Sequence, residues 1–224
     1  MVRIFRILSF FLLAGLLACG PVLAEDSPEE TVNKSLKVVK ALLTSHDRSI
    51  PEDLLKTSAG VAVVPALWKG GFIVGGSLGN GVVLRHKGKS WSPPAFFKFG
   101  MASVGLQFGV QKIELVMVIM GQKTMNAFLK SKFKLGGDVA VAAGPVGARS
   151  SAATEINLKG GIYSYSRTKG LFAGFSLEGG GIDATPKLNR RYYKTTSSVK
   201  DILAGKVTVP ESGRRLIKEL NKYH

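Results

Sequence analysis

Glycine recurs through the middle of this chain in a pattern that few folds accommodate. The 224 residues include 27 glycines, many of them alternating with apolar residues. Glycine weakens a helix interior, so this content excludes a helical bundle and favours a sheet with many turns or close backbone contacts. In SVGLQFGVQ (103–111), apolar side chains share one face, and glycine or glutamine occupies the other. Glycine leaves that second face flat, so another element can approach it closely.

Several apolar segments separated by turn residues predict antiparallel strands. The Asn-Gly pair within residues 79–81 predicts a tight hairpin, because both residues tolerate positive φ. Residues 87–89, Lys-Gly-Lys, predict the next turn. A further hairpin is expected around residues 168–170, since the chain alternates on both sides of them. The remaining strand candidates are 60–65, the continuous apolar run 113–120, which is typical of a central strand, and 138–147.

The two ends of the chain have helical rather than extended patterns. Residues 29–45 place Val32, Leu36, Val39 and Leu43 on one helical face. Other helices are expected at 51–57, at 122–133 and, in two pieces broken by Pro210, at 197–224. The predicted fold class is therefore α+β: a mostly antiparallel, barrel-like β core with an N-terminal helix, one inserted helix and C-terminal helices.

Residues 1–24 are expected to be a secretory signal peptide rather than part of the folded domain. Arg3 and Arg6 precede an apolar run and then small residues, and the run is too short for a membrane span. Cleavage after Ala24 leaves a single domain, 25–224. Alternatively, residues 16–19 form a lipobox and the signal peptide ends before Cys19, which would then be lipidated and become the new N-terminus. Either route predicts export across the inner membrane, to the periplasm or to a membrane-anchored lipoprotein.

No pattern of residues predicts an enzyme. Gly88-Lys89-Ser90 matches the end of a phosphate-binding loop, but the glycine that this motif requires at position 83 is Val83. The three histidines have no second ligand at metal spacing, and no G-x-S-x-G motif singles out a serine. We therefore predict no catalytic residue, no metal site, no cofactor and a binding function.

The charge indicates the chemistry of the partner. The formal net charge is +16, which favours an anionic partner. An exported chain seldom meets nucleic acid, so an anionic phospholipid membrane is the expected partner. The alternative is that the bases are merely solvated and that the first helix packs on the domain. The candidate lipid-binding residues are Lys34, Lys37 and Lys40 on that helix, and Lys69, Arg85, Lys87, Lys89, Arg149, Arg167 and Lys169 beside glycine-containing turns.

Several long motifs, in order, resemble the SYLF domain over about residues 30–220. They are SAGVAVVPALWKGGFIVGGSLGNGVVL (58–84), WSPPAFFKFGMASVGLQFGVQ (91–111), VAAGPVGARSSA (141–152), SYSRTKGLFAGFSLEGG (164–180) and NRRYY (189–193). The resemblance implies a lipid-binding module. Eukaryotic members bind phosphoinositides and other acidic lipids, partly through a basic amphipathic N-terminal segment, and bacterial members are typically exported.

Two functions remain open at this level. The first is a peripheral protein of the bacterial envelope that binds anionic headgroups. The second is a structural or protein-interaction module whose charge serves an acidic protein or a cell-wall polymer. An outer-membrane barrel is a third, weaker reading, because the run 113–120 does not alternate and both ends are helical.

Overall fold

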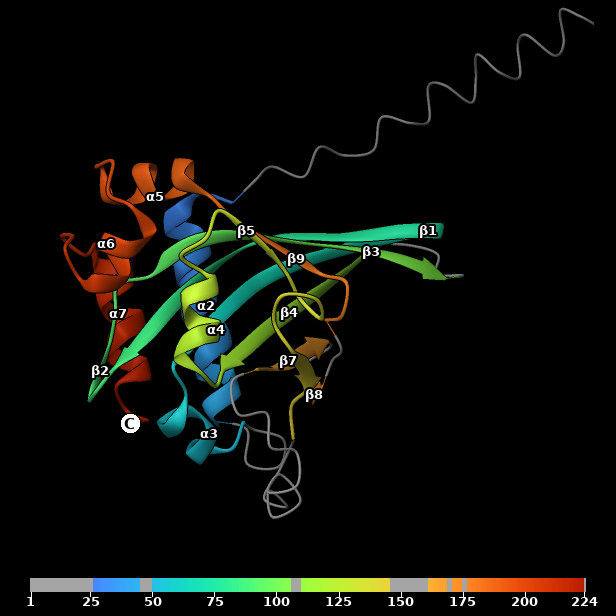
Figure 1. The fold of residues 1–224 in the computed structure, drawn as a ribbon, viewed down its shortest axis with the longest axis horizontal. Helices are drawn as coiled ribbons and strands as arrows, with labels where there is room; N and C mark the ends of the chain where they lie inside the picture. Colours follow the sequence, from blue (N-terminus) through green and yellow to red (C-terminus); the bar gives the residue numbers. More distant parts are fainter. Residues whose placement is uncertain are drawn as a thin grey trace, which may run out of the picture.

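A curled, mostly antiparallel sheet organises this α+β chain, and helices from both ends of the sequence pack together beside it (Figure 1). The computed structural model describes residues 26–44, 50–105, 110–145, 161–168, 171–174 and 177–223. The predicted signal peptide and Cys19 lie outside these residues. None of the described helices is long and apolar enough to cross a membrane.

The sheet runs in the order β5-β9-β3-β1-β4-β7-β6, with β2 paired to β1 and β8 to β7. Its named pairs are antiparallel except β6 with β7. The strands are β1 Gly60–Lys87, β2 Ser90–Trp91, β3 Ala95–Gly105, β4 Val110–Ile119, β5 Lys132–Lys134, β6 Val141–Ala143, β7 Ile162–Thr168, β8 Leu171–Gly174 and β9 Gly181–Ala184. The helices are α2 Pro28–Thr44, α3 Glu52–Thr57, α4 Gln122–Ala127, α5 Pro186–Tyr193, α6 Val199–Ala204 and α7 Glu211–Leu220.

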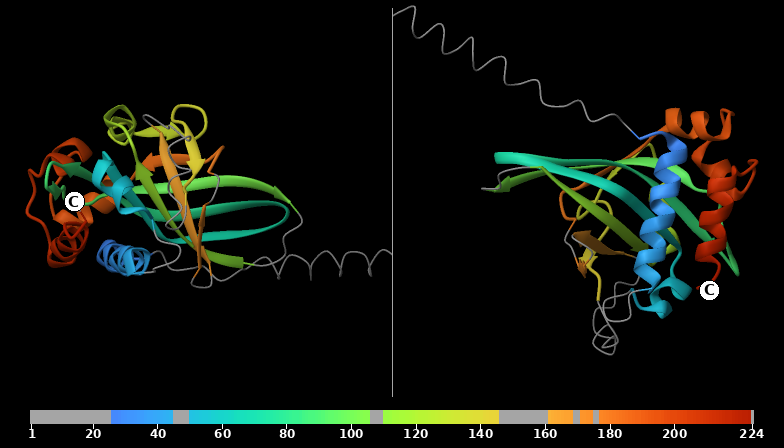
Figure 2. Two further views of the ribbon diagram at one scale, coloured as in Figure 1. Left: turned by 90° about the horizontal axis from the view of Figure 1, so that it is seen from below. Right: turned by 180° about the vertical axis from the view of Figure 1, so that it is seen from behind.

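Strand β1 spans 28 residues and bends back on itself, so that its two halves face each other (Figure 2). Its first half pairs with β4, from Gly60 opposite Ile119 to Gly70 opposite Val110. Its second half pairs with β3, from residue 73 onward. The single strand predicted at 103–111 is thus divided between β3 and β4, which pair with different halves of β1.

The predicted Asn-Gly hairpin is wrong. Gly79, Asn80 and Gly81 pair with consecutive residues of β3, and no positive φ is found at these three positions. A Cβ added at Gly79 would lie 2.6 Å from the carbonyl oxygen of Ala66. One at Gly81 would lie 2.6 Å from that of Val63. These glycines therefore serve close approach of the two halves of β1, and not a turn.

Other local predictions are confirmed, with two corrections. Gly88 has φ 61° between β1 and β2, and Thr168 pairs with Leu171 across the predicted hairpin. The helices at 29–45, at 51–57 and on both sides of Pro210 are present. The inserted helix ends at Ala127 instead of 133, because Lys132–Lys134 joins the sheet as β5 beside β9. Helix α5 was not predicted.

Helix α5 carries the NRRYY motif, and the motif ties the C-terminal helices to the sheet. The Asn189 Oδ1 atom accepts a hydrogen bond from the backbone N–H of Phe96 at 2.9 Å. The Tyr193 hydroxyl donates to the carbonyl oxygen of Pro94 at 2.6 Å, and the Tyr192 hydroxyl lies 2.8 Å from Ser212 Oγ on α7. These side chains are buried, so the motif serves packing and buried polar pairing.

Candidate functional site

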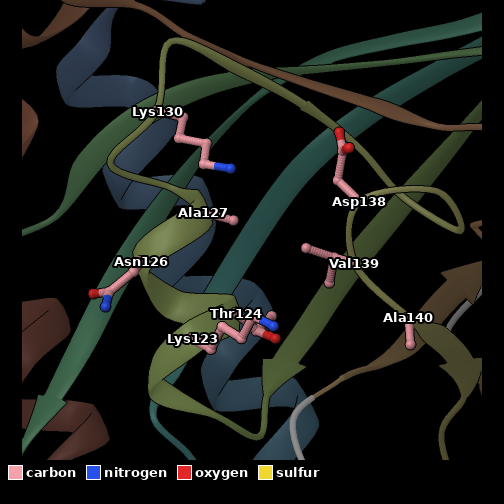
Figure 3. Close-up of a pocket in the computed structure, with 8 residues that line it drawn as sticks. All are labelled: Lys123, Thr124, Asn126, Ala127, Lys130, Asp138, Val139 and Ala140. Atoms are coloured by element: carbon pink, nitrogen blue, oxygen red, sulfur yellow. The ribbon is translucent and has the colours of Figure 1, made fainter.

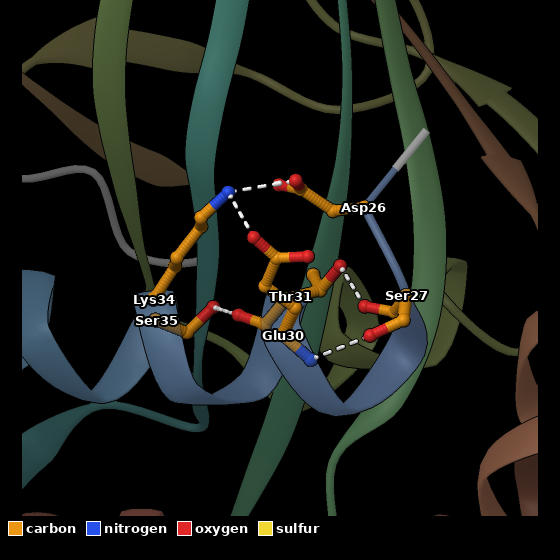
Figure 4. A network of polar contacts seen from close by, with 6 residues as sticks. All are labelled: Asp26, Ser27, Glu30, Thr31, Lys34 and Ser35. Carbon is orange, nitrogen blue, oxygen red and sulfur yellow. Dashed lines mark hydrogen bonds and ion pairs between the residues drawn. The ribbon is translucent and has the colours of Figure 1, made fainter. Parts of the chain in front are cut away.

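Helix α2 is docked on the domain by the apolar face that its sequence predicts. Of the predicted face, Val32 and Val39 are at most 1% exposed and Leu36 is half-buried; Val38, outside that prediction, is also buried, and α2 packs against β1 and α7. Ser27 organises the start of the helix, because its Oγ accepts from the N–H of Glu30 at 3.2 Å and its carbonyl oxygen accepts from Thr31 Oγ1 at 3.0 Å (Figure 4). The lysines of α2 therefore lie on a helix that is held in place by its packing on the domain.

Lys34, the first of the three lysines predicted on α2, is neutralised locally by two carboxylates. Its Nζ lies 2.7 Å from Asp26 and 2.8 Å from Glu30 (Figure 4). The hydrogen bond to Asp26, and then that to Glu30, raises the pKa of Lys34. The same contact with Lys34 lowers the pKa of Glu30. With two carboxylates on one ammonium group, Lys34 offers little charge to an external anion.

Lys37 and Lys40 are exposed, and the fold places them beside a second basic helix. The Arg215 Nη2 atom on α7 donates to Asn33 Oδ1 on α2 at 2.9 Å. Lys37 and Lys40 follow Asn33 by four and seven positions, so the three residues share a helical face. Helices α2 and α7 lie side by side (Figure 2). We call the outer surface formed by Lys37, Lys40, Arg215 and Lys218 the α2–α7 face.

Sequence reasoning missed Arg215 and Lys218. The signal was present in GRRLIKEL, where Leu216 and Leu220 are buried while the bases are exposed. That pattern predicts an amphipathic helix with a basic outer side. The pattern does not show which helix packs beside this one, so the sequence alone does not place the bases of α7 next to those of α2.

The bases predicted at the β1–β2 turn mainly bind the protein itself. The Arg85 Nη2 atom donates to Asn126 Oδ1 at 2.7 Å. The Lys87 Nζ atom donates to the carbonyl oxygen of Ala204, the last residue of α6, at 2.9 Å. A cation at a helix C-terminus satisfies a carbonyl that has no partner within the helix. Lys89 is exposed at the turn.

The other predicted bases are not brought to the same surface. Arg167 forms a half-buried ion pair with Glu114, its cross-strand neighbour on β4. Lys69 lies in β1 opposite Gln111, near the bend of that strand. Arg149 and Lys169 lie outside the described residues. The described members of the predicted set are therefore spread over the fold. Of these, Lys37 and Lys40 belong to the α2–α7 face.

A cavity of about 370 Å³ lies between α4 and the turn after β5 (Figure 3). Its polar lining residues are Lys123, Thr124, Asn126, Lys130 and Asp138. The Asp138 Oδ2 atom already accepts from the N–H of Lys134 at 2.7 Å. The part of the chain that the structure describes has no cluster of three or more His, Cys, Asp or Glu able to hold a metal ion.

Comparison with known proteins identifies the family. A family model described as "Ysc84: Las17-binding protein actin regulator" matches residues 100–223, more than half of the chain. The chain belongs to the Ysc84 family. This is the SYLF family that the motifs indicate, and its description is one of binding and regulation. The matched Ysc84 region includes the NRRYY motif and α7, whereas α2 and β1 precede it.

Curated relatives extend this Ysc84 similarity over most of the chain. "Protein YSC84" of Saccharomyces cerevisiae is 32% identical over 203 residues, which is 87% of this chain and 43% of that protein. "LAS seventeen-binding protein 3" from the same yeast is 34% identical over 178 residues, or 78% of this chain and 39% of the relative. "SH3 domain-containing YSC84-like protein 1" of Xenopus laevis is 30% identical over 198 residues, or 85% and 59%. The chain thus spans about half the length of these relatives.

Proposed function

We propose that this Ysc84-family chain is a non-enzymatic protein that binds anionic phospholipid headgroups at the bacterial envelope, after export across the inner membrane. The observation that carries the proposal is the α2–α7 face. It sets exposed cations from two distant parts of the sequence on adjacent helices. Lysine and arginine side chains are strong hydrogen-bond donors to phosphate oxygens. The chain from Glu25, which lacks Arg3 and Arg6, has a formal net charge of +14, which adds long-range attraction to an anionic surface.

The docking of α2 favours recognition by charge over insertion of the helix. To enter a bilayer by its apolar side, α2 would have to uncover Val32, Val38 and Val39, which are buried against the domain. Burial of such a side chain is worth about 1.5–3 kcal/mol, so release of all three opposes detachment strongly. We therefore assign to α2 a peripheral role, with Lys37 and Lys40 facing the headgroups.

An acidic protein is the second candidate partner. Relatives carry names such as "LAS seventeen-binding protein 3", and these names record protein binding. Exposed bases on a rigid pair of helices would serve an acidic protein surface equally well. The distinguishing property is the dependence of binding on lipid.

Vesicle co-sedimentation of the chain from Glu25 tests the proposal. The described packed elements begin after this residue, and a Cys19 acyl anchor is removed. Pelleting is expected with anionic vesicles and not with zwitterionic ones, and raised salt should weaken it because exposed charges are screened. The absence of pelleting with anionic vesicles at low salt would refute lipid binding and favour the protein partner.

A charge-matched pair of variants locates the surface. Lys37→Gln/Lys40→Gln/Lys218→Gln removes three cations from the α2–α7 face, and affinity is expected to fall about 100-fold at roughly 1 kcal/mol per base. The control, Lys123→Gln/Lys130→Gln/Lys134→Gln, removes the same charge from exposed positions on α4 and around β5. Equal losses in both variants would show that net charge acts without a defined face.

A further inference from the structure

The large apolar side chains that the described residues expose are gathered at one end of the sheet. They are Trp68, Leu78 and Val110, at 37%, 57% and 71% exposure. Isolated apolar residues are common on protein surfaces and need no explanation. These three lie near the same end of the sheet, Trp68 and Val110 on the outer side of the first half of β1 and Leu78 on the outer side of its second half.

Strand register places them around that bend. Val110 is paired with Gly70. Lys112, two residues further along β4, is paired with Trp68, two residues earlier on β1. Alternation puts Trp68, Val110 and Lys112 on one face of the β1–β4 pair. In the second half of β1, Leu78 is paired with Gly100 and Asn80 with Lys98. Leu78 precedes Gly79, which faces the first half of β1, so its side chain points away from that half.

The bend projects away from the helices. In Figure 1 the bent end of β1 and the end of β3 extend on the side of the molecule opposite α6 and α7. Lysines flank the apolar residues there: Lys69 follows Trp68, Lys112 lies opposite it, and Lys98 shares the face of Leu78. We call this set of three apolar and three basic side chains the β-tip.

We propose that the β-tip inserts its apolar side chains into the interfacial layer of an anionic bilayer, while its lysines bind the headgroups. This inference rests on the proposed lipid binding. Because the β-tip lies on the side of the molecule opposite α6 and α7, it assigns to that function a second contact, separate from the α2–α7 face. Tryptophan is favoured at membrane interfaces, where its ring is buried and its N–H stays near water. The lysines are complementary to anionic headgroups, with aliphatic stems that lie along an apolar surface while their ammonium groups remain in water. A projecting end of a sheet can also reach a flat surface without rearrangement of the core.

The two tryptophans make the proposal directly measurable. Trp91 is 4% exposed and stacks on His86 with ring centroids 4.5 Å apart, so it is shielded from lipid. In Trp91→Phe, Trp68 is the single emitter. Its emission should shift to the blue on addition of anionic vesicles, and lipids brominated on their acyl chains should quench it. In the matched variant Trp68→Phe, the remaining Trp91 should show neither effect.

A charge-neutral variant provides an independent readout. Leu78→Gln/Val110→Thr retains every lysine, and it should weaken binding to anionic vesicles about tenfold because the aliphatic burial on binding is lost. Vesicles that pellet the protein while Trp68 emission stays unshifted and unquenched would overturn the β-tip but leave the proposed function intact. No pelleting at all would overturn both. A shift of Trp68 emission produced by an acidic protein, and not by vesicles, would identify the tip as a protein contact and refute insertion.

Discussion

The close approach of the two halves of β1 predicts a specific sensitivity to a single added methyl group. In Gly79→Ala the new Cβ would lie 2.6 Å from the Ala66 carbonyl oxygen and 2.7 Å from Val64 Cγ1. The side chain of Val64 could rotate away. The Ala66 oxygen is a backbone atom at the register irregularity between Val64 and Leu67, so relief of this contact requires a shift of the β1 backbone.

The magnitude follows from two opposing effects. Overpacking of this kind typically destabilises by about 1–3 kcal/mol. Replacement of glycine in a strand recovers about 0.5–1 kcal/mol through the lower entropy of the unfolded chain. Because the clash involves backbone, we expect a net loss of about 2 kcal/mol, which lowers the Tm of a domain of this size by about 4–8 °C.

Gly76→Ala is the matched control on the same strand. A Cβ there would meet the Met101 carbonyl oxygen at 3.5 Å, which is an ordinary van der Waals contact. This variant should be as stable as the parent, or slightly more so. Thermal unfolding and urea unfolding, each followed by circular dichroism, give the Tm and the free energy of unfolding of each variant. Equal stabilities for Gly79→Ala and Gly76→Ala would refute the close-approach explanation of the glycines.

Two further predictions concern the contacts made by α5. Asn189→Ala leaves the buried N–H of Phe96 without its acceptor and should destabilise by about 1–3 kcal/mol in urea unfolding, whereas Arg190→Ala on the exposed side of the same helix should have little effect. Burial raises the pKa of Tyr192 to about 12 and raises that of Tyr193 as well. An unfolded tyrosine ionises near pH 10, so the unfolded state loses its proton first and the free energy of unfolding should fall as pH rises from about 10 to about 12. Tyr192→Phe should reduce this slope, and an unchanged slope would contradict the assignment.

The sequence predicts what depends on neighbouring residues. Apolar spacing identifies α2. The Lys-Gly-Lys sequence predicts the turn before β2, where Gly88 indeed has a positive φ. The Asn-Gly pair within Gly79–Gly81 led to a wrong prediction. Glycine is favoured both in a tight turn and where another backbone segment approaches closely, and the local sequence is the same in the two cases. Only the position of residues 63–67, more than ten positions away, distinguishes the two cases.

The same distinction applies to the candidate site. The sequence identifies basic residues, but it does not show which of them the protein itself uses. Lys34 and Lys87 bind groups that become neighbours only through the fold or the chain entry to α2, whereas Lys37 stays exposed. Arg215 joins α2 through Asn33, 182 positions earlier in the chain. The Arg215–Asn33 contact depends on the packing of α2 against α7, and the Lys87 contact on the position of α6, and no local pattern encodes either.

The position of β1 has a consequence for how this protein can be divided. Its two halves separate β3 from β4 in the sheet order, and each of those strands takes its main ladder from β1. A fragment cut at the limits of the family match, 100–223, would lack β1 and leave β4 with an unpaired edge. Because both ladders share β1, we expect them to be lost together in one cooperative transition. The region that the family model matches, 100–223, is therefore smaller than the sheet that β1 organises.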